Sequence, residues 1–298
     1  MAARIGWELY RSFLAVLTEG SLSGAARALG LAQPTVGRHV AALQKALGIT
    51  LFTRAPSGLL PTESALSLRS YAQTMSSTAA ALERAAGSQG SGVRGTVRVT
   101  ASEVVGAEVL PSVIARLRER HPELQIELAL SDRMQDLLQR EADIAVRMAR
   151  PAQELLIARR IGHVQVGLHA ARQYLKRHGT PDTTADLRRH SLIGFDQSTA
   201  FVRAAAKAFP AYSRETFAVR TDSNLAQLAL IRAGAGIGPC QVALGRRDGL
   251  VHILPGQFSL PLDTWIVMHE DLRNSRCCRV TFDALVAGLQ KHIAAATP

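Results

Sequence analysis

The first 47 residues carry apolar side chains at helical spacing in three successive runs. The first run includes positions 9, 13, 16 and 17. The second is short, has small apolar residues at 25, 26 and 29, and ends at Gly30, because glycine adopts the left-handed conformation of a helix end without penalty. The third begins near Gln33-Pro34, where proline is tolerated in a first turn, and ends at Gly48. This succession predicts a helix-turn-helix, with a small helical bundle as the alternative.

A β-hairpin is predicted directly after the third helix. Leu51–Arg54 and Leu59–Leu60 are short strand-like runs, and the Pro- and Gly-containing segment Ala55–Gly58 between them is typical of a turn. A hairpin in this place is a wing. It favours a winged helix-turn-helix over residues 5–62 and argues against a plain bundle.

Residues 63–92 are predicted to form a long helix followed by a hinge. Apolar residues recur at alternating steps of three and four, which is the a/d pattern of a helix that pairs with another helix; they are Ala65, Leu68, Ala72, Met75, Ala79, Leu82 and Ala86. We interpret the segment as a dimerisation helix, with packing on its own domain as the alternative. Gly87–Gly92 has the composition of a flexible linker.

From residue 93 onwards strand-like and helix-like runs alternate, which predicts an α/β domain with a mainly parallel sheet. The expected strands are 96–100, 124–130, 144–148, 155–161, 164–168, 192–195, 217–220, 237–238 and 265–269. The expected helices are 110–120, 134–140, 171–178, 200–208, 224–233 and 277–293. Two runs of this pattern predict two lobes, lobe I over 93–163 and 265–298, and lobe II over 164–264.

Composition and charge narrow the class of protein. The 298 residues are 47% hydrophobic and 20% charged, as in globular proteins. The net charge of +11 favours acidic partners. Three cysteines, no secretory signal and no apolar run long enough to span a bilayer predict a cytoplasmic protein.

The sequence offers little that points to catalysis. Gly234–Gly238 lacks the spacing of a dinucleotide loop, and the nine histidines form no close-set metal-ligand cluster with the cysteines. We therefore predict no catalytic residue, no metal and no cofactor, and a protein that is not an enzyme.

Glu19–Gly48, followed by Leu51–Arg54, resembles the LysR-type transcriptional regulators. Further pieces match in order, among them Glu141–Arg147 and Ala233–Gly238. The resemblance covers the whole chain. It implies a winged helix-turn-helix, a linker helix and an effector domain like the bilobal periplasmic binding proteins. It also implies a dimer that in this family often assembles into a tetramer, and RNA polymerase as a partner.

The chain departs from the family pattern at two positions of the third helix and at one position beside its start. Gly37 stands where a serine is usual, Gln44 replaces a common glutamate, and Ala32 replaces a common polar residue beside the helix start. These departures bear on the DNA sequence preference, since Gly37 lies on the side of the helix expected to face DNA.

Nine residues are candidates for contact with double-stranded DNA. The early residues of a recognition helix face base edges in the major groove, which nominates Gln33, Pro34, Thr35, Arg38 and His39. Phosphate candidates lie at the second helix and on the wing; they are Ser21, Ser23, Arg27 and Arg54. The alternative for Arg38 and His39 is a solvated helix face.

Four residues are candidates for an effector site, because ligands bind beyond the carboxyl ends of strands in open α/β sheets. They are Ser102, Ser131, Arg147 and Asn224. Arg147 and the amino ends of the following helices favour a carboxylate or another small anion. The alternative is that Arg147 pairs with Asp143 or Glu103 and that the serines cap helices.

The sequence thus predicts a DNA-binding transcriptional regulator whose activity changes when a small anionic effector binds between two lobes and shifts their packing. A second hypothesis is a redox-responsive regulator that uses Cys240, Cys277 or Cys278. A solute-binding protein or an enzyme is the alternative of another class, although a transport protein would not carry a helix-turn-helix.

Overall fold

The computed structural model describes residues 5–56, 58–87, 92–131, 142–150, 156–199, 202–203, 206 and 213–296. The described chain divides into two compact units, one ending at Glu83 and one beginning at Arg84. The expected helix at 134–140 lies outside the described residues, and so does most of that at 200–208.

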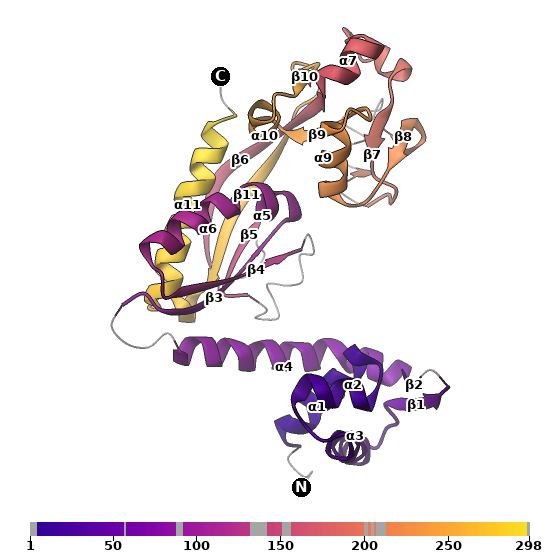
Figure 1. Cartoon of the computed structure of the whole chain (residues 1–298), viewed down its shortest axis with the longest axis vertical. Coiled ribbons are helices and arrows are strands. Elements are labelled where there is room, and N and C mark those ends of the chain that lie inside the picture. Colours follow the sequence, from indigo (N-terminus) through magenta and orange to yellow (C-terminus); the bar gives the residue numbers. More distant parts are fainter. Residues whose placement is uncertain are drawn as a thin grey trace. The chain divides into compact units, whose positions relative to one another are not determined.

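The amino-terminal unit begins with three helices, α1 (Trp7–Glu19), α2 (Leu22–Leu29) and α3 (Gln33–Leu47), which confirm the predicted helix-turn-helix (Figure 1). Each ends at a glycine with positive φ, as at Gly30 with φ 65°. One core holds them together, and its fully buried members include Phe13, Val16, Ala25, Val36, Leu43 and Leu51.

The wing is an antiparallel hairpin of β1 (Phe52–Ala55) and β2 (Gly58–Pro61), as predicted. The Gln44 side chain anchors its start, because Oε1 accepts hydrogen bonds from the amides of Leu51 at 2.7 Å and Phe52 at 3.2 Å. The amide of Leu59 donates to the carbonyl of Gly20 at 3.1 Å and so ties the wing to the end of α1. Gly58 has φ 127°, and a Cβ there would lie 2.9 Å from that same carbonyl oxygen.

Helix α4 (Glu63–Gly87) follows the wing and corrects part of the heptad prediction. Ala65 and Ala72 are buried in the core of the head, and Leu68 packs against it. The first half of the seam is therefore used within the chain, which was the alternative interpretation. The second half remains open, since Met75 is 40% and Leu82 70% exposed.

The second unit is built on one nine-stranded sheet with the order β4-β3-β5-β11-β6-β9-β7-β8, and β10 pairs with β6. At one end β3 (Gly95–Ala101), β4 (Leu124–Leu130) and β5 (Ile144–Arg147) are parallel. At the other end β7 (Leu192–Gly194), β8 (Phe217–Arg220) and β9 (Ile237–Gln241) are parallel. The long antiparallel strands β6 (Leu156–Ala170) and β11 (Leu260–His269) join the two ends (Figure 1).

Helices and short elements complete the two lobes. We use lobe I for β3–β5 with α5 (Glu103–Glu108), α6 (Leu110–Arg120) and α11 (Arg276–Ala294). Lobe II comprises β7–β9, β10 (Val251–Ile253), α7 (Arg172–His178), α9 (Asn224–Arg232) and α10 (Val242–Arg247). Short 3-10 turns lie at Asp186–Arg189, Arg214–Thr216 and Glu270–Leu272.

The passage between the lobes differs from the prediction in one respect. The segments expected at 155–161 and 164–168 are one strand, β6, in which Gly162 has φ 146°. Its pairing with β11 shifts register between Thr264 and Trp265. A glycine and a register shift at the same level bend the ribbon without ending it, so the chain crosses into lobe II without a loop.

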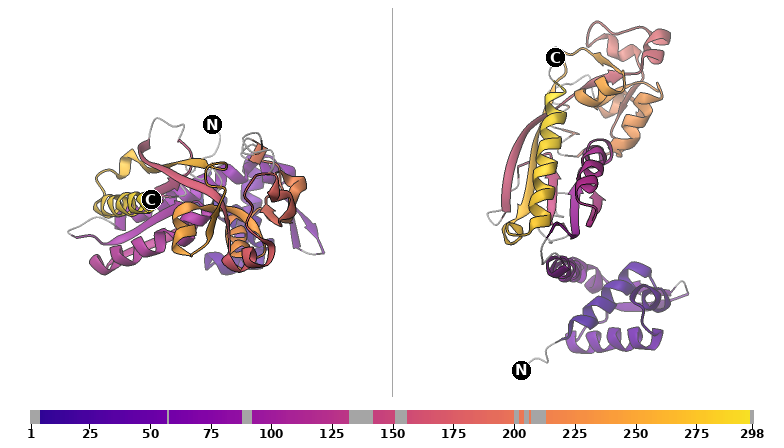
Figure 2. Two further views of the ribbon diagram at one scale, coloured as in Figure 1. Left: turned by 90° about the horizontal axis from the view of Figure 1, so that it is seen from above. Right: turned by 60° about the vertical axis from the view of Figure 1, so that its left-hand side comes forward.

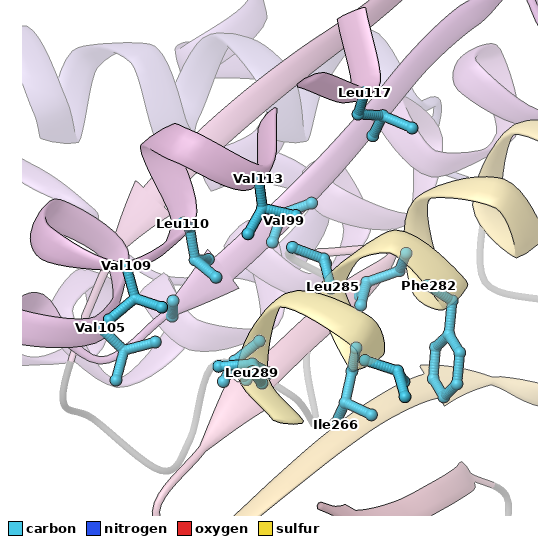
Figure 3. Packing of buried hydrophobic residues seen from close by; sticks show 14 of the residues in the cluster. Val99, Val105, Val109, Leu110, Val113, Leu117, Ile266, Phe282, Leu285 and Leu289 are labelled. Atoms are coloured by element: carbon cyan, nitrogen blue, oxygen red, sulfur yellow. The ribbon is translucent and has the colours of Figure 1, made fainter. Parts of the chain in front are cut away.

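The lobe I core lies between the sheet and its helices. Figure 3 shows side chains of α5 and α6 directed toward those of α11 over the sheet, and Figure 2 shows α11 running beside β6 and β11. Its labelled members are Val99, Val105, Val109, Leu110, Val113, Leu117, Ile266, Phe282, Leu285 and Leu289. A second cluster in lobe II contains Tyr174, Leu187, Leu192 and Phe217. Among the described helices, none is both long and apolar enough to cross a membrane.

Two stacked histidines in lobe II make stability depend on pH. The rings of His169 and His252 are 4.6 Å apart and nearly parallel, and His169 Nδ1 lies 3.0 Å from the carbonyl of Gly167. Burial lowers the pKa of His169 to about 4. Because the unfolded histidine has a pKa of about 6.5, the unfolded chain takes up a proton first as the pH falls. The contribution of His169 is therefore fully present above pH 6.5 and is lost between there and about pH 4.

We expect the free energy of unfolding to fall by about 2 kcal/mol through His169 between about pH 7.5 and about pH 5. Urea denaturation followed by circular dichroism measures this change. The variant His169→Phe keeps a stacked ring but cannot titrate, so its stability should change less over the same interval. Equal pH dependence in the two proteins would contradict the assignment.

Candidate nucleic-acid interface and effector site

The first turns of α3 present the predicted base-reading residues at the surface. Gln33, Pro34 and Arg38 are exposed and Thr35 is half-buried. Arg38 Nη2 donates to Thr35 Oγ1 at 3.3 Å, so these two side chains share one helix face. The hydrogen bond holds the guanidinium beside the start of the helix, where it can meet a guanine edge or a phosphate.

His39 differs from its neighbours on α3. It is half-buried, and its Nδ1 lies 2.8 Å from the hydroxyl of Ser12, which is buried on α1. The structure therefore gives His39 a partner inside the head, and the ring fastens α3 to α1.

The phosphate candidates lie on α2 and the wing. Ser21 is the N-cap of α2, and its Oγ accepts from the amide of Gly24 at 3.0 Å. The hydroxyl of Ser23 lies 3.4 Å from that of Ser21, and Arg27 is exposed further along α2. Arg54 is exposed on β1. The hydroxyl of Ser21 already caps the helix. The exposed side chains of Ser23, Arg27 and Arg54 are therefore better placed to bind phosphate.

Gly37 can be replaced without a clash, which gives a test of the α3 geometry. A Cβ at Gly37 would meet Leu22 Cδ1 at 3.7 Å, an ordinary contact. Because a glycine inside a helix costs about 1 kcal/mol relative to alanine, Gly37→Ala should stabilise the head by about that amount. Thermal unfolding checks this. Gly58→Ala is the matched control and should destabilise the head, since Gly58 has positive φ and no room for a Cβ. A lower melting temperature for Gly37→Ala would contradict the described helix packing.

Three of the four effector candidates lie at one edge of the lobe I sheet. β3 pairs with β4 at Ala101 and Leu130, and with β5 at Ala101 and Val146. The residues that follow these positions, Ser102, Ser131 and Arg147, therefore leave the sheet at the same edge. Ser102 is the N-cap residue of α5, but its side chain makes no capping hydrogen bond. The structure therefore does not support the alternative that Ser102 only caps a helix.

Asn224, the fourth candidate, belongs to lobe II and follows a residue that contacts α5. It is the first residue of α9, and the preceding Ser223 caps α9 by accepting from the amide of Ala226 at 3.3 Å. The Ser223 hydroxyl also donates to Glu103 Oε2 at 3.5 Å, in the first turn of α5. This contact brings the amino ends of α5 and α9 together across the two lobes.

The Arg147 side chain is buried, with only 4% exposed. Its Nη2 donates to Thr100 Oγ1 at 3.0 Å, and its Nη1 donates to the carbonyl of Val146 at 3.2 Å. The suggested partner Asp143 is engaged elsewhere, since it accepts from Arg84 at 2.8 Å and from the amide of Arg98 at 2.8 Å.

Trp265 is a candidate that the sequence did not reveal. It lies opposite Arg147 in the pairing of β11 with β5, so both side chains lie on the same face of the sheet. Its indole Nε1 is buried and has no hydrogen-bond acceptor within the described residues. The signal was absent from the sequence, because it depends on the register of strands more than 100 residues apart.

The three cysteines are buried. Burial raises the pKa of Cys240 to about 12 and that of Cys278 to about 11, and it also raises the pKa of Cys277. The Cys277 thiol donates to the carbonyl of Arg94 at 2.7 Å. Redox-sensing thiols have low pKa values and are accessible, so these environments favour a structural role.

Two family models match the chain. The LysR substrate binding domain matches residues 90–290, and the bacterial regulatory helix-turn-helix protein of the lysR family matches residues 7–66. The chain therefore belongs to the LysR family of transcriptional regulators. It is a DNA-binding regulator with an effector-binding domain, as the sequence predicted.

The chain is similar to regulators of known sequence and structure. It is 26% identical to the probable HTH-type transcriptional regulator LtrA of Klebsiella pneumoniae, over 92% of this chain and 91% of that protein. An HTH-type transcriptional regulator of Xanthomonas campestris pv. campestris (strain 8004) is 30% identical over 61% of this chain, which spans 53% of the relative's length. Full-length CbnR, solved with its target DNA, has a TM-score of 0.65 at 18% identity, over 98% of this chain and 100% of that one. Both sequence relatives are named as transcriptional regulators, which agrees with the predicted class of protein.

Proposed function

We propose that the chain binds an interrupted palindrome in duplex DNA as a dimer. Its contacts with the DNA would change when a small anion binds in the effector domain. Residues 5–62 would read DNA, residues 63–92 would form the dimer and hinge, and residues 93–298 would sense the effector. The observation that carries the DNA-binding part is the exposed first half of α3 with Arg38 held beside Thr35. In this proposal RNA polymerase is the partner of the promoter-bound protein, and the compartment is the cytoplasm.

The DNA contacts divide into two kinds. Gln33, Pro34, Thr35 and Arg38 would read base edges, because they lie on the first turns of α3. Ser21, Ser23, Arg27 and Arg54 would position the head on phosphates, which carry no sequence information. His39 would act mainly by holding α3 against Ser12.

The open half of α4 supports the dimer. Trp7, at the start of α1, and the exposed half of α4 line an apolar groove of about 390 Å³. Its α4 residues are Thr74, Met75, Thr78, Ala79 and Leu82. One recognition helix reads few base pairs, so a palindrome requires two copies, and this groove offers the surface that a second copy would cover. Assembly of dimers into a tetramer is the family's further expectation.

The effector site would be formed by Ser102, Ser131, Arg147 and Asn224. The buried guanidinium of Arg147 favours an anionic ligand, because a charged hydrogen bond in a buried place is strong. The hydroxyls of Ser102 and Ser131 would accept or donate at its rim, and the indole N–H of Trp265 would supply a further donor. A small carboxylate has the acceptors that this set requires.

A thermal-shift screen of small mono- and dicarboxylates, followed by calorimetric titration of any compound that raises the melting temperature, tests the effector part. Arg147→Ala should lower the affinity of a confirmed carboxylate by roughly tenfold or more, since a charge-assisted hydrogen bond contributes about 1.5–3 kcal/mol. Arg98→Ala, which removes an exposed arginine of the same lobe, should leave that affinity unchanged. Unchanged affinity in Arg147→Ala would remove Arg147 from the site.

A further inference from the structure

Helices α5 and α9 lie side by side across the boundary between the lobes and run in the same direction. Their amino ends meet where Ser223 donates to Glu103, and their carboxyl ends meet where Arg232 contacts Glu108 at 2.8 Å. Apolar residues pack between them, with Val105 of α5 and Ile231 of α9 in one buried cluster. Apolar contact is not directional, so it holds the helices together without fixing their angle.

A ring of four charged residues closes the carboxyl ends of this helix pair. We call Glu108, Arg232, Arg247 and Asp248 the ion ring. Arg232 binds both carboxylate oxygens of Glu108 at 2.8 Å and also contacts Asp248 at 2.7 Å. Arg247 contacts Asp248 at 2.8 Å and Glu108 on its other side. Two guanidiniums and two carboxylates therefore alternate, with Glu108 from lobe I and the other three residues from lobe II.

The ring is built to fix an orientation. The carboxylates of Glu108 and Asp248 are only 17% and 16% exposed, so water screens them less than it screens a surface pair. Hydrogen bonds from Arg232 lower the pKa of Glu108 to about 2, so the ring stays charged at neutral pH. Paired bonds between a planar guanidinium and a carboxylate fix direction as well as distance. Arg247 Nη1 also donates to the backbone carbonyl of Glu108 at 3.0 Å, where the carboxyl end of α5 needs a donor.

The strands that connect the lobes are more compliant than the ion ring, and polar contacts such as His292 with Gln241 at 2.8 Å also join α11 to lobe II. Strands β6 and β11 cross the boundary as a two-stranded ribbon that contains Gly162 and a register shift beside Thr264. Such a ribbon can bend, whereas the ring joins three elements whose charged residues must stay in register. We propose that the ion ring is a latch that holds the two lobes in one orientation. The consequence for regulation rests on the proposed function: release of the latch would let the lobes part at the effector site.

Electron paramagnetic resonance distance measurements on the full chain test the latch. Nitroxide labels on Glu119→Cys in α6 and Lys176→Cys in α7 report the distance between the lobes, and excess unlabelled chain suppresses signals between copies. Both positions are exposed and the native cysteines are buried, so labelling is selective. Glu108→Gln should broaden the distance distribution and add longer distances. Glu127→Gln is the matched control, because it breaks the Arg98–Glu127 pair within lobe I and should leave the distribution unchanged.

A distribution in Glu108→Gln that coincides with that of the parent would overturn the latch. If Glu108→Gln does not fold, Arg247→Gln removes one corner of the ring at a half-exposed position and serves in its place. DNA binding by the labelled parent is measured on the same samples. Loss of DNA binding in the parent and in both variants would count against the proposed function. The latch is tested only by the distances between the two nitroxide labels.

Discussion

Leu82→Glu is expected to convert the proposed dimer to a monomer and to weaken operator binding roughly 10²–10⁴-fold. Leu82 is 70% exposed in the single chain and lines the apolar groove with Met75. A glutamate there would bury an unpaired carboxylate in the proposed interface, which is strongly unfavourable. Without the dimer, the second half-site contact becomes a separate bimolecular event, and linked binding of this kind contributes about 10²–10⁴ to the overall affinity.

Leu66→Glu is the matched control for this experiment. Leu66 is 48% exposed on the same helix, but it lies on the opposite side and does not line the groove. Analytical ultracentrifugation gives the oligomeric state, and fluorescence anisotropy gives the affinity for DNA. Leu66→Glu should remain a dimer with unchanged affinity. A Leu82→Glu protein that is still dimeric would place the interface elsewhere.

Arg38→Ala should weaken binding to the operator by roughly 10- to 100-fold and binding to random duplex only a few-fold. A bidentate contact between arginine and guanine contributes about 1–3 kcal/mol of discrimination, whereas a phosphate contact weakens all sequences alike. Arg38 is exposed and lies beside Thr35 on the face of α3 that would enter the major groove.

The control removes one positive charge from the head without touching α3. Arg11 is exposed on α1, and Arg11→Ala should lower affinity for the operator and for random duplex by the same small factor. Anisotropy titrations of both duplexes at two salt concentrations separate the effects. Equal losses on the two duplexes in Arg38→Ala would show that Arg38 contacts phosphate only.

The sequence was most informative where structure depends on near neighbours. Glycine stops and apolar spacing predicted α1–α3, and the Ala55–Gly58 turn predicted the wing. The packing of α4 was harder to predict, because one heptad repeat supplies residues to two different surfaces. Ala65 and Ala72 pack on the head, while Leu82 stays exposed, and the repeat itself does not distinguish the two uses. The segments predicted at 155–161 and 164–168 are one strand, β6, because Gly162 at φ 146° and the register shift opposite it let the ribbon continue.

The features that were missed depend on distant pairing. The ion ring joins Glu108 to Arg232 and Arg247, which are more than 120 residues away, so no local motif contains it. Trp265 meets Arg147 only through strand register. α10 and β10 are too short to produce a periodic signal. Gln44 departs from the family pattern, and its side chain holds the start of the wing.

Selection of bound fragments from a pool of genomic DNA tests the central claim most directly. The account predicts that the purified chain enriches a small set of fragments that share an interrupted palindrome with half-sites one or more helical turns apart. It also predicts that Leu82→Glu loses this enrichment while Leu66→Glu keeps it. Recovery of fragments in proportion to the input pool, at low ionic strength and with a monomeric protein, would contradict it.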